Sequence, residues 1–341
     1  MGWLSFMTED IAIDLGTANT LITYQDKVVV DSPSIVAMDR RSGQIIAVGK
    51  EARQMHGKTH ENIKTIRPLK DGVIADFEAS EHMIRELIKS IPAFKKRLFP
   101  PSLRMVICIP SGITEVEKRA VKDSAEHANA KEVYLIHEPM AAAVGIGVNV
   151  LEPKGNMIID IGGGTTEIAI LAMGGIVCDK SIKVAGDVFT NDIAMYMRAQ
   201  HNLFVGERTA ESIKISVGAA LEDLDDAPEP FAVQGRDLLT GKPKQVLVTH
   251  GEVARALEKS ITRVEDAVME ALSNTPPELA ADIVDKGVVV AGGGSLIKGL
   301  DILLREATGL PITLASDALS AVALGSGKAL CDINLLKKIA I

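Results

Sequence analysis

The stretch Ile11–Ile22, IAIDLGTANTLI, returns in the second half of the chain as IIDIGGGTTEI, Ile158–Ile168. The two copies align without a gap and share an aspartate, a glycine and a threonine. The matched pairs are Asp14 with Asp160, Gly16 with Gly162, and Thr20 with Thr166. Each copy is typical of a strand, an Asp-x-Gly turn and a second strand. One such hairpin in each half predicts two similar domains.

The turns of both copies are suited to phosphate binding. Glycine leaves backbone amides uncovered, permits a close approach and tolerates positive φ angles. The two turns consist of Gly16, Thr17, Ala18 and Asn19, and of Gly162, Gly163, Gly164 and Thr165. We expect Asp14 and Asp160 to reach Mg²⁺, directly or through water, because this ion prefers oxygen ligands. A lone copy would be equally consistent with an ordinary tight turn.

A third glycine run, Gly292–Gly294, follows the apolar strand pattern Gly287–Ala291. A helical pattern then covers Leu296–Ala307, and Ser295 is placed to cap it. Bare glycine at this position lets a flat base or a ribose lie against the backbone. A tight connection between a strand and a helix is the alternative interpretation.

Glu138 is the candidate for the hydrolytic residue. It precedes Pro139, which favours the first helical position, and a helix of small residues follows over Met140–Gly147. A carboxylate at that place can orient or activate a water molecule. Alternatively it only interacts with the helix dipole, and the local sequence does not separate the two roles.

The bulk composition narrows the class of protein. The chain of 341 residues suits two domains, with 47% hydrophobic and 24% charged residues. Its net charge of −8 disfavours a nucleic-acid binder. The 3 scattered cysteines argue for a reducing compartment and against a zinc or disulfide framework. No apolar run is long enough to span a membrane and no secretory signal is recognisable, which together predict a cytoplasmic protein.

Strand and helix patterns alternate along the chain and predict an α/β fold with mixed or parallel sheets. The expected strands are Ile11–Asp14, Val28–Val30, Met105–Ile109, Met157–Asp160 and Gly287–Ala291. A one-sided apolar pattern predicts a helix over Ser80–Ile91. A second helix is expected over Thr114–Ala128, where Thr114 and Glu117 form a capping box. No P-loop, GxGxxG fingerprint or HExxH motif competes with the paired turns.

The motifs together resemble the superfamily of actin, Hsp70 and sugar kinases. DLGTANTLI, HEPMAAAVG, DIGGGTTEIA and VVVAGGGSLIKGLD resemble the MreB family, the bacterial actins of rod-shaped cells. The resemblance implies an actin-like fold of two duplicated ribonuclease-H-like domains, with smaller inserted subdomains around a central nucleotide cleft. The implied divisions are a membrane-binding segment 1–10, domain I at 11–143 plus 315–341 with subdomain IB at about 32–66, and domain II at 144–314 with subdomain IIB at about 183–245.

The same resemblance implies roles for the site residues. The two glycine turns would contact the phosphates, Asp14 and Asp160 would hold Mg²⁺ largely through water, and Glu138 would position the attacking water with help from Thr165. Four further residues would surround the nucleoside, namely Glu211 and Lys214 at the ribose and base, and Gly292 and Gly293 beside the adenosine. A surface i,i+3 salt pair is the alternative for Glu211 and Lys214. Unlike eukaryotic actin, the first phosphate loop has Asn19 in place of a lysine.

Two apolar segments suggest membrane contact. As a helix, the N-terminus would present an apolar arc formed by Trp3, Leu4, Phe6 and Met7. The loop Pro92–Pro101 combines Leu98 and Phe99 with a basic cluster, a combination that suits an anionic membrane surface. The alternative is that the N-terminus packs on the protein. The absence of basic residues in Met1–Asp10 weakens the N-terminal half of the hypothesis.

The predicted function follows from the family resemblance. We expect an ATP- and Mg²⁺-dependent cytoskeletal ATPase that hydrolyses slowly and forms filaments on the inner face of the cell membrane. These filaments would organise cell-wall synthesis and maintain rod shape, together with membrane proteins of the MreC, MreD and RodZ type and without nucleic acid. A sugar- or acetate-type kinase and an Hsp70-type chaperone are the alternatives on the same scaffold.

Overall fold

Two sheets of the same topology form the base of the molecule. The computed structural model describes residues 8–95 and 101–341. The first sheet contains β10 (Ala130–His137), β9 (Ser102–Ile109), β1 (Thr8–Leu15), β2 (Asn19–Tyr24) and β3 (Lys27–Pro33), in this order. The second contains β18 (Ile312–Leu314), β17 (Val288–Ala291), β11 (Asn156–Ile161), β12 (Thr166–Ala172) and β13 (Gly175–Ile182). The two orders correspond strand for strand, which confirms the predicted duplication.

The duplicated hairpins occupy the centre of each sheet. β1 pairs antiparallel with β2 and parallel with β9, and β11 pairs in the same two ways with β12 and β17. All residues of β11 and β12 are buried. Strands covered on both faces carry nearly continuous apolar runs, and this composition is what made the strands recognisable in the sequence.

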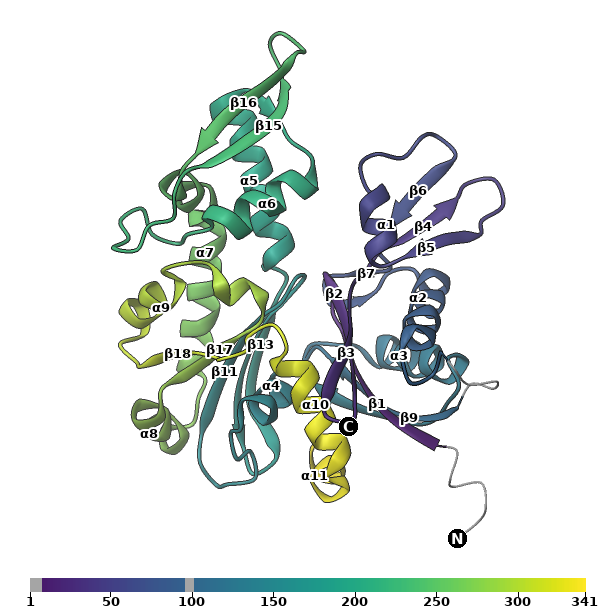
Figure 1. Cartoon of the computed structure of the whole chain (residues 1–341). Coiled ribbons are helices and arrows are strands. Elements are labelled where there is room, and N and C mark those ends of the chain that lie inside the picture. The colour runs from purple at the N-terminus through teal and green to yellow at the C-terminus, as the bar shows by residue number, and fades with distance from the viewer. Residues whose placement is uncertain (1–7, 96–100) are drawn as a thin grey trace.

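Helices α2 (Phe77–Ser90) and α3 (Glu115–His127) cover the first sheet (Figure 1). The predicted capping box of α3 is confirmed, since the side chains of Thr114 and Glu117 each bond the other residue's backbone amide. α2 begins three residues before the predicted Ser80, because the Asp76 side chain accepts a hydrogen bond from the Ala79 amide and caps the helix there.

Helices α4 (Glu138–Ile146) and α10 (Ala321–Cys331) lie against each other between the two sheets, and α11 (Ile333–Ile339) follows α10 (Figure 1). The crossing requires small residues on both helices. A Cβ added at Gly145 would collide with the Ala321 carbonyl oxygen, and one at Gly325 with that of Ala141. Contact between the two backbones therefore sets the distance between the halves.

Each half also carries a smaller upper part, seen above its sheet in Figure 1. In the first half this part contains β4 (Val36–Asp39), β5 (Ile45–Val48), β6 (Ile63–Ile66) and α1 (Lys50–Met55), followed by the short hairpin of β7 (Leu69–Lys70) and β8 (Val73–Ile74). In the second half it contains α5 (Gly186–His201), α6 (Glu207–Val217), β14 (Leu203–Phe204), β15 (Phe231–Asp237) and β16 (Pro243–Val248). The exact domain bounds given above stay a prediction.

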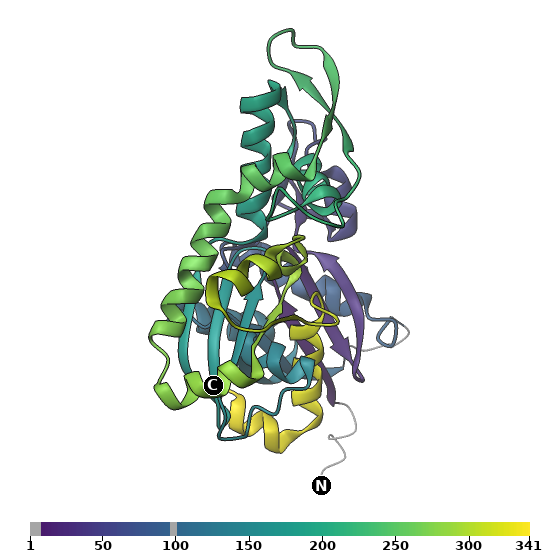
Figure 2. The ribbon, with the colours of Figure 1, turned by 90° about the vertical axis from the view of Figure 1, so that its left-hand side faces the viewer.

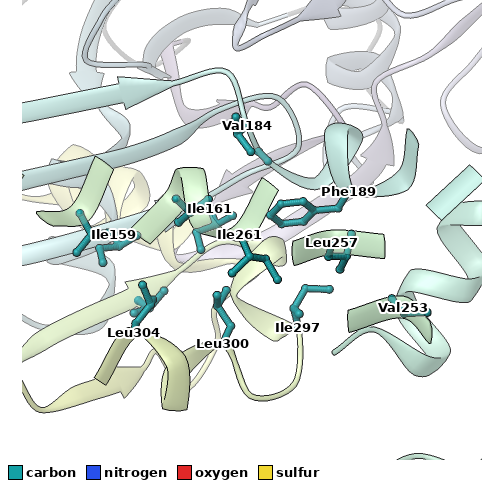
Figure 3. Packing of buried hydrophobic residues seen from close by; sticks show 14 of the residues in the cluster. Ile159, Ile161, Val184, Phe189, Val253, Leu257, Ile261, Ile297, Leu300 and Leu304 are labelled. Carbon is teal, nitrogen blue, oxygen red and sulfur yellow. The ribbon is translucent and has the colours of Figure 1, made fainter. Parts of the chain in front are cut away.

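The long helix α7 (His250–Ser273) runs along the second half, from the upper part down beside the sheet (Figure 2). Phe189 of α5 and Leu257 and Ile261 of α7 belong to the same buried cluster as Ile159 of β11 (Figure 3). Full burial of one large aliphatic side chain contributes roughly 1.5–3 kcal/mol. This cluster therefore holds the upper part firmly on the second sheet.

The third glycine run is built differently from the prediction. A short 3-10 helix, η2, covers Gly293–Leu296, and α8 (Pro277–Lys286) precedes this region. The next α-helix, α9, spans Leu300–Thr308 and begins after Gly299 in the left-handed conformation. Ser295 does not cap α9, because its hydroxyl donates to the Gly292 carbonyl oxygen at 2.6 Å. The predicted start of this helix at Leu296 was therefore wrong.

Candidate active site

The turns of the two hairpins face each other across the space between the halves. A Cβ added at Gly163 would lie 2.7 Å from Ala18 Cβ, and one added at Gly164 would lie 2.5 Å from Thr17 Oγ1. Real Cβ atoms do not approach other heavy atoms so closely, so both positions require glycine. The structure thus brings together two turns whose sequences lie far apart along the chain.

The reason for these glycines differs in part from the prediction. None of the glycines in the two turns has a positive φ angle, whereas Gly292 in the third run has a φ of 81°. Close approach of the opposite turn therefore selects glycine at Gly163 and Gly164. Gly292 requires glycine because its backbone is left-handed, and an added Cβ there would also collide with Asp160 Oδ1.

Carboxyl groups from both halves gather where the turns meet. Burial raises the pKa of Asp14 to about 7 and that of Asp160 to about 7, and the charge of Asp14 adds to the shift at Asp160. Burial also raises the pKa of Glu138 well above its usual range, with further contributions from Glu167, Asp160 and Asp14. These electrostatic effects show that Asp14, Asp160, Glu138 and Glu167 lie near one another.

The carboxylate oxygens of Asp14 and Asp160 are the donors that Mg²⁺ prefers. In residues 8–95 and 101–341, no group of three or more His, Cys, Asp or Glu side chains is arranged to hold a metal ion. The ion would therefore need water or phosphate oxygens to complete its coordination. The role of the two aspartates in holding Mg²⁺, mainly through water, stays a prediction.

A turn that was not predicted from the sequence lies between the two hairpins. Asp71 and Gly72 connect β7 to β8, with φ angles of 51° and 79°. The Gly72 amide donates to Thr17 Oγ1 at 2.9 Å. A Cβ added at Gly72 would lie 3.3 Å from Thr165 Oγ1. The Asp-Gly pair is a recognisable turn signal, but nothing in its neighbourhood along the chain indicates this location.

Glu211 and Lys214 form an i,i+3 ion pair on α6, the alternative interpretation given above, with 2.7 Å between Oε2 and Nζ. Lys214 Nζ also donates to the Gly186 carbonyl oxygen at 2.8 Å and to Thr190 Oγ1 at 3.0 Å. Burial alone would raise the pKa of Glu211, but Lys214 and Thr190 lower it overall. The pair is therefore anchored to the start of α5, and its contact with a ribose or base stays a prediction.

Ion pairs connect the upper parts of the two halves. Arg67 of the first half contacts Asp187 at 2.8 Å and Glu207 at 2.9 Å, both in the second half. His56 Nε2 lies 3.3 Å from Glu207 Oε2. A small cavity lined by His56, Arg67 and Glu207 extends to Ala18 of the first turn. These contacts, which join the two halves, could not be predicted from the sequence.

The proposed membrane-contacting residues cannot be placed. Trp3, Leu4, Phe6, Met7, Leu98 and Phe99 lie outside the described residues. Among the helices of the described part of the chain, none is both long and apolar enough to cross a bilayer.

Comparison with known proteins identifies the family. The sequence model of the MreB/Mbl protein family matches residues 8–338. The chain belongs to the MreB/Mbl family. Among its MreB/Mbl relatives, the cell shape-determining protein Mbl of Bacillus subtilis is 47% identical over 330 residues, covering 96% of this chain and 98% of the relative. The cell shape-determining protein MreB of Escherichia coli K12 is 45% identical over 333 residues, covering 96% and 95%.

Solved structures agree with this assignment to the MreB/Mbl family. MreB5 of Spiroplasma citri bound to ADP superposes with a TM-score of 0.89 and is 38% identical, covering 97% of this chain and 98% of that one. The MamK double helical filament superposes with a TM-score of 0.79 at 22% identity, covering 94% and 98%, which shows the fold alone. The predicted actin-like fold is confirmed, and the family favours the cytoskeletal interpretation over a small-molecule kinase.

Proposed function

We propose that this MreB/Mbl-family chain is an ATP-dependent cytoskeletal protein. It binds ATP with Mg²⁺ between its two halves, hydrolyses it slowly and assembles into filaments that organise cell-wall synthesis and maintain rod shape. The observation that carries the proposal is the meeting of the two turns, with Asp14 and Asp160 in one carboxylate cluster. Support comes from relatives named as cell shape-determining and from MreB5 structures bound to ADP and AMPPNP.

Each turn has a role in holding the nucleotide. The backbone amides of residues 16–19 and 162–165 bind the phosphates from opposite sides, as bare amides in glycine turns do. Asp14 and Asp160 hold Mg²⁺, mainly through its waters. Bound Mg²⁺ supplies the positive charge that offsets the phosphates and the carboxylate cluster. With Asn19 in the first turn, this neutralisation relies on the ion and the amides.

Glu138 and Thr165 are the residues that we assign to hydrolysis. Glu138 begins α4 beside the carboxylate cluster, and Thr165 ends the second turn. Glu138 accepts a hydrogen bond from the attacking water and orients it, while the hydroxyl of Thr165 holds the same water from the other side. Glu211 and Lys214 contact the ribose and base, and Gly292 and Gly293 leave room for the adenosine.

Assembly and membrane contact complete the proposal. ATP favours the assembled state and hydrolysis weakens it, so the filament turns over. The polymer consists of copies of this chain on the inner face of the cell membrane, with Trp3, Leu4, Phe6, Met7, Leu98 and Phe99 as the contacting side chains. Membrane proteins of the MreC, MreD and RodZ type are the partners that the family resemblance implies.

One experiment tests the proposed function as a whole. Purified protein is mixed with Mg²⁺ and ATP, and assembly is followed by light scattering and by electron microscopy on a lipid monolayer. Phosphate release is recorded in parallel. The proposal predicts concentration-dependent, ATP-dependent filaments on the lipid and slow phosphate release. Phosphorylation of a sugar or acetate without polymer would instead support the kinase.

A further inference from the structure

Glu167 is a buried carboxyl group for which the fold alone gives no reason. It lies on β12 directly opposite Asp160 and is 0% exposed. At the matching place in the first hairpin, opposite Asp14, the residue is Leu21, which is also buried. The hairpin therefore forms with a leucine at this position, whereas burying a carboxyl group costs the free energy of its desolvation. This difference between two otherwise similar hairpins indicates a specific role for Glu167.

The hydrogen bonds of Glu167 join the two halves of the molecule. Its Oε2 accepts from the Ser111 amide at 3.0 Å and from the Ser111 hydroxyl at 2.6 Å. Its Oε1 accepts from the Ser181 hydroxyl at 2.6 Å. Ser111 follows β9 in the first half, whereas Ser181 is the neighbour of Glu167 on β13 in the second half. In the described part of the chain, none of these bonds comes from a lysine or arginine.

The segment that Glu167 holds is hydrogen-bonded to the residue that precedes Glu138. Pro110 precedes Ser111, and its carbonyl oxygen accepts a hydrogen bond from His137 Nδ1 at 3.3 Å. His137 is the residue immediately before Glu138 and the N-cap of α4. Pro110 also borders the missed turn, since a Cβ added at Gly72 would lie 2.7 Å from Pro110 Cγ. The segment is thus fixed between the start of α4 and the phosphate-binding turns.

We propose that Glu167 is a positioning residue for ATP hydrolysis, which acts by holding Ser111 across the two halves and so fixing the start of α4 that carries Glu138. The inference rests on the proposed ATPase activity. Glu167 lies close enough to Glu138 to add, after burial, to the rise of its pKa, in agreement with this placement. Because the bond to Ser111 spans both halves, the placement of Glu138 depends on how the halves are arranged.

The test uses variants that differ in which bond they remove. Glu167→Ala removes all three bonds, Ser111→Ala removes the hydroxyl bond that crosses between the halves, and Ser181→Ala removes the bond within one sheet and is the matched control. For each full-length variant, ATP affinity is measured by competition with a fluorescent nucleotide. The rate of phosphate release is measured in a single turnover at saturating ATP and Mg²⁺.

We expect Glu167→Ala to lower the single-turnover rate by about tenfold or more, and Ser111→Ala to lower it by a smaller but clear factor. The affinity for ATP should change by less than about twofold in both, because positioning acts on the transition state. Ser181→Ala should stay near the wild-type rate. Glu167→Gln should recover most of the rate, since its amide oxygen can still accept from Ser111 and its NH₂ can donate to the Ser181 hydroxyl.

Several results would overturn the inference. Normal rates in Glu167→Ala and Ser111→Ala would contradict it. A loss of rate in Ser181→Ala as large as that in Ser111→Ala would also contradict it. So would a Glu167→Gln variant that is as slow as Glu167→Ala. If Glu167→Ala fails to fold, Ser111→Ala and Glu167→Gln decide the question.

The variant Glu138→Ala distinguishes a failure of the proposed function from a failure of the inference about Glu167. If Glu138→Ala has wild-type turnover, the proposed hydrolytic role of Glu138 is contradicted. If Glu138→Ala is slow but Ser111→Ala and Glu167→Ala are normal, only the inference about Glu167 is contradicted.

Discussion

At the scale of single residues, Glu138 is the proposed hydrolytic residue. It begins a helix, and burial together with neighbouring carboxylates raises its pKa. We predict that Glu138→Ala binds ATP with nearly normal affinity but releases phosphate about 100-fold more slowly, the lower end of general-base contributions. Rapid-quench measurement of a single turnover checks this. Wild-type turnover in the variant would remove Glu138 from the mechanism.

The raised pKa values of Asp14 and Asp160 predict how stability depends on pH. A carboxyl group whose pKa is higher in the folded state keeps its proton there over a wider range. The contribution of these two groups to the free energy of unfolding therefore falls as the pH rises from 3.8, the ordinary pKa of an aspartate, to about 7, and levels off above that. Thermal unfolding of the protein without metal or nucleotide should show this loss.

The control for the pH prediction is the double variant with Asp14→Asn and Asp160→Asn. It should lose less stability than the wild type between pH 4 and about 7, because neither amide ionises. Added Mg²⁺ and ATP should stabilise the wild type more at neutral than at acidic pH, where protons compete with the ion. An unchanged pH slope in the double variant would contradict the assignment of these two groups.

The sequence predicted the residues of the paired turns because a repeated motif makes them visible. It did not predict Gly72, Thr190 or Arg67, because each reaches the site only through contacts with residues distant in the chain. Glu167 was part of the quoted repeat, yet its difference from Leu21 gains meaning only when the structure shows which side chains it contacts.

At the scale of elements, apolar periodicity and caps predicted β1, β9, β11, α2 and α3 well, as did the Asp-x-Gly signals of the two hairpins. The start of α9 was wrong, because Ser295 bonds back to Gly292 and the chain forms a 3-10 turn first. Very short strands such as β7 and β14 carry too few residues to produce a period of their own. Their positions depend on tertiary pairing.

The crossing of α4 and α10 gives a prediction about stability. Gly325→Ala puts a Cβ against the Ala141 carbonyl oxygen, and two packed helix backbones must separate to admit it. Helix propensity favours alanine by about 1 kcal/mol, but the clash should outweigh this and leave a net loss of about 2 kcal/mol or more. Urea unfolding provides the measurement.

The matched control for Gly325 is Gly251→Ala in the first turn of α7, where an added Cβ would meet atoms only at 3.9 Å or beyond. This change should be neutral or stabilising by up to about 1 kcal/mol. Equal stability of Gly325→Ala and the wild type would show that the two helices can separate without cost.

At the scale of the whole molecule, Arg67 connects the upper parts of the two halves by ion pairs. Its ion pairs are between about one third and one half exposed, so they contribute roughly 1 kcal/mol together. We predict that Arg67→Ala changes global stability little but releases bound nucleotide about fivefold faster, which corresponds to that energy. A chase of fluorescent ATP gives the rate.

The control for Arg67 is Arg305→Ala, which breaks an i,i+4 ion pair with Asp301 within α9. Its release rate should equal that of the wild type. If Arg67→Ala also releases nucleotide at the wild-type rate, the contacts over the turns do not restrict opening of the two halves.

The duplicated architecture was predictable because the repeat fixes the centre of each sheet, and alternating strands and helices indicate the α/β class. The closed arrangement of the halves was not predictable. It depends on the α4–α10 crossing, the Arg67 ion pairs and the bond between Ser111 and Glu167, which all join residues far apart in the sequence.

The central claim is that two matched turns hold the phosphates of one nucleotide from opposite sides. A crystal structure of the protein with a non-hydrolysable ATP analogue and Mg²⁺ tests it most directly. The account predicts phosphate oxygens at the amides of residues 16–19 and 162–165, with Mg²⁺ held between Asp14 and Asp160 through water. A nucleotide bound elsewhere, or bound by only one of the two turns, would contradict it.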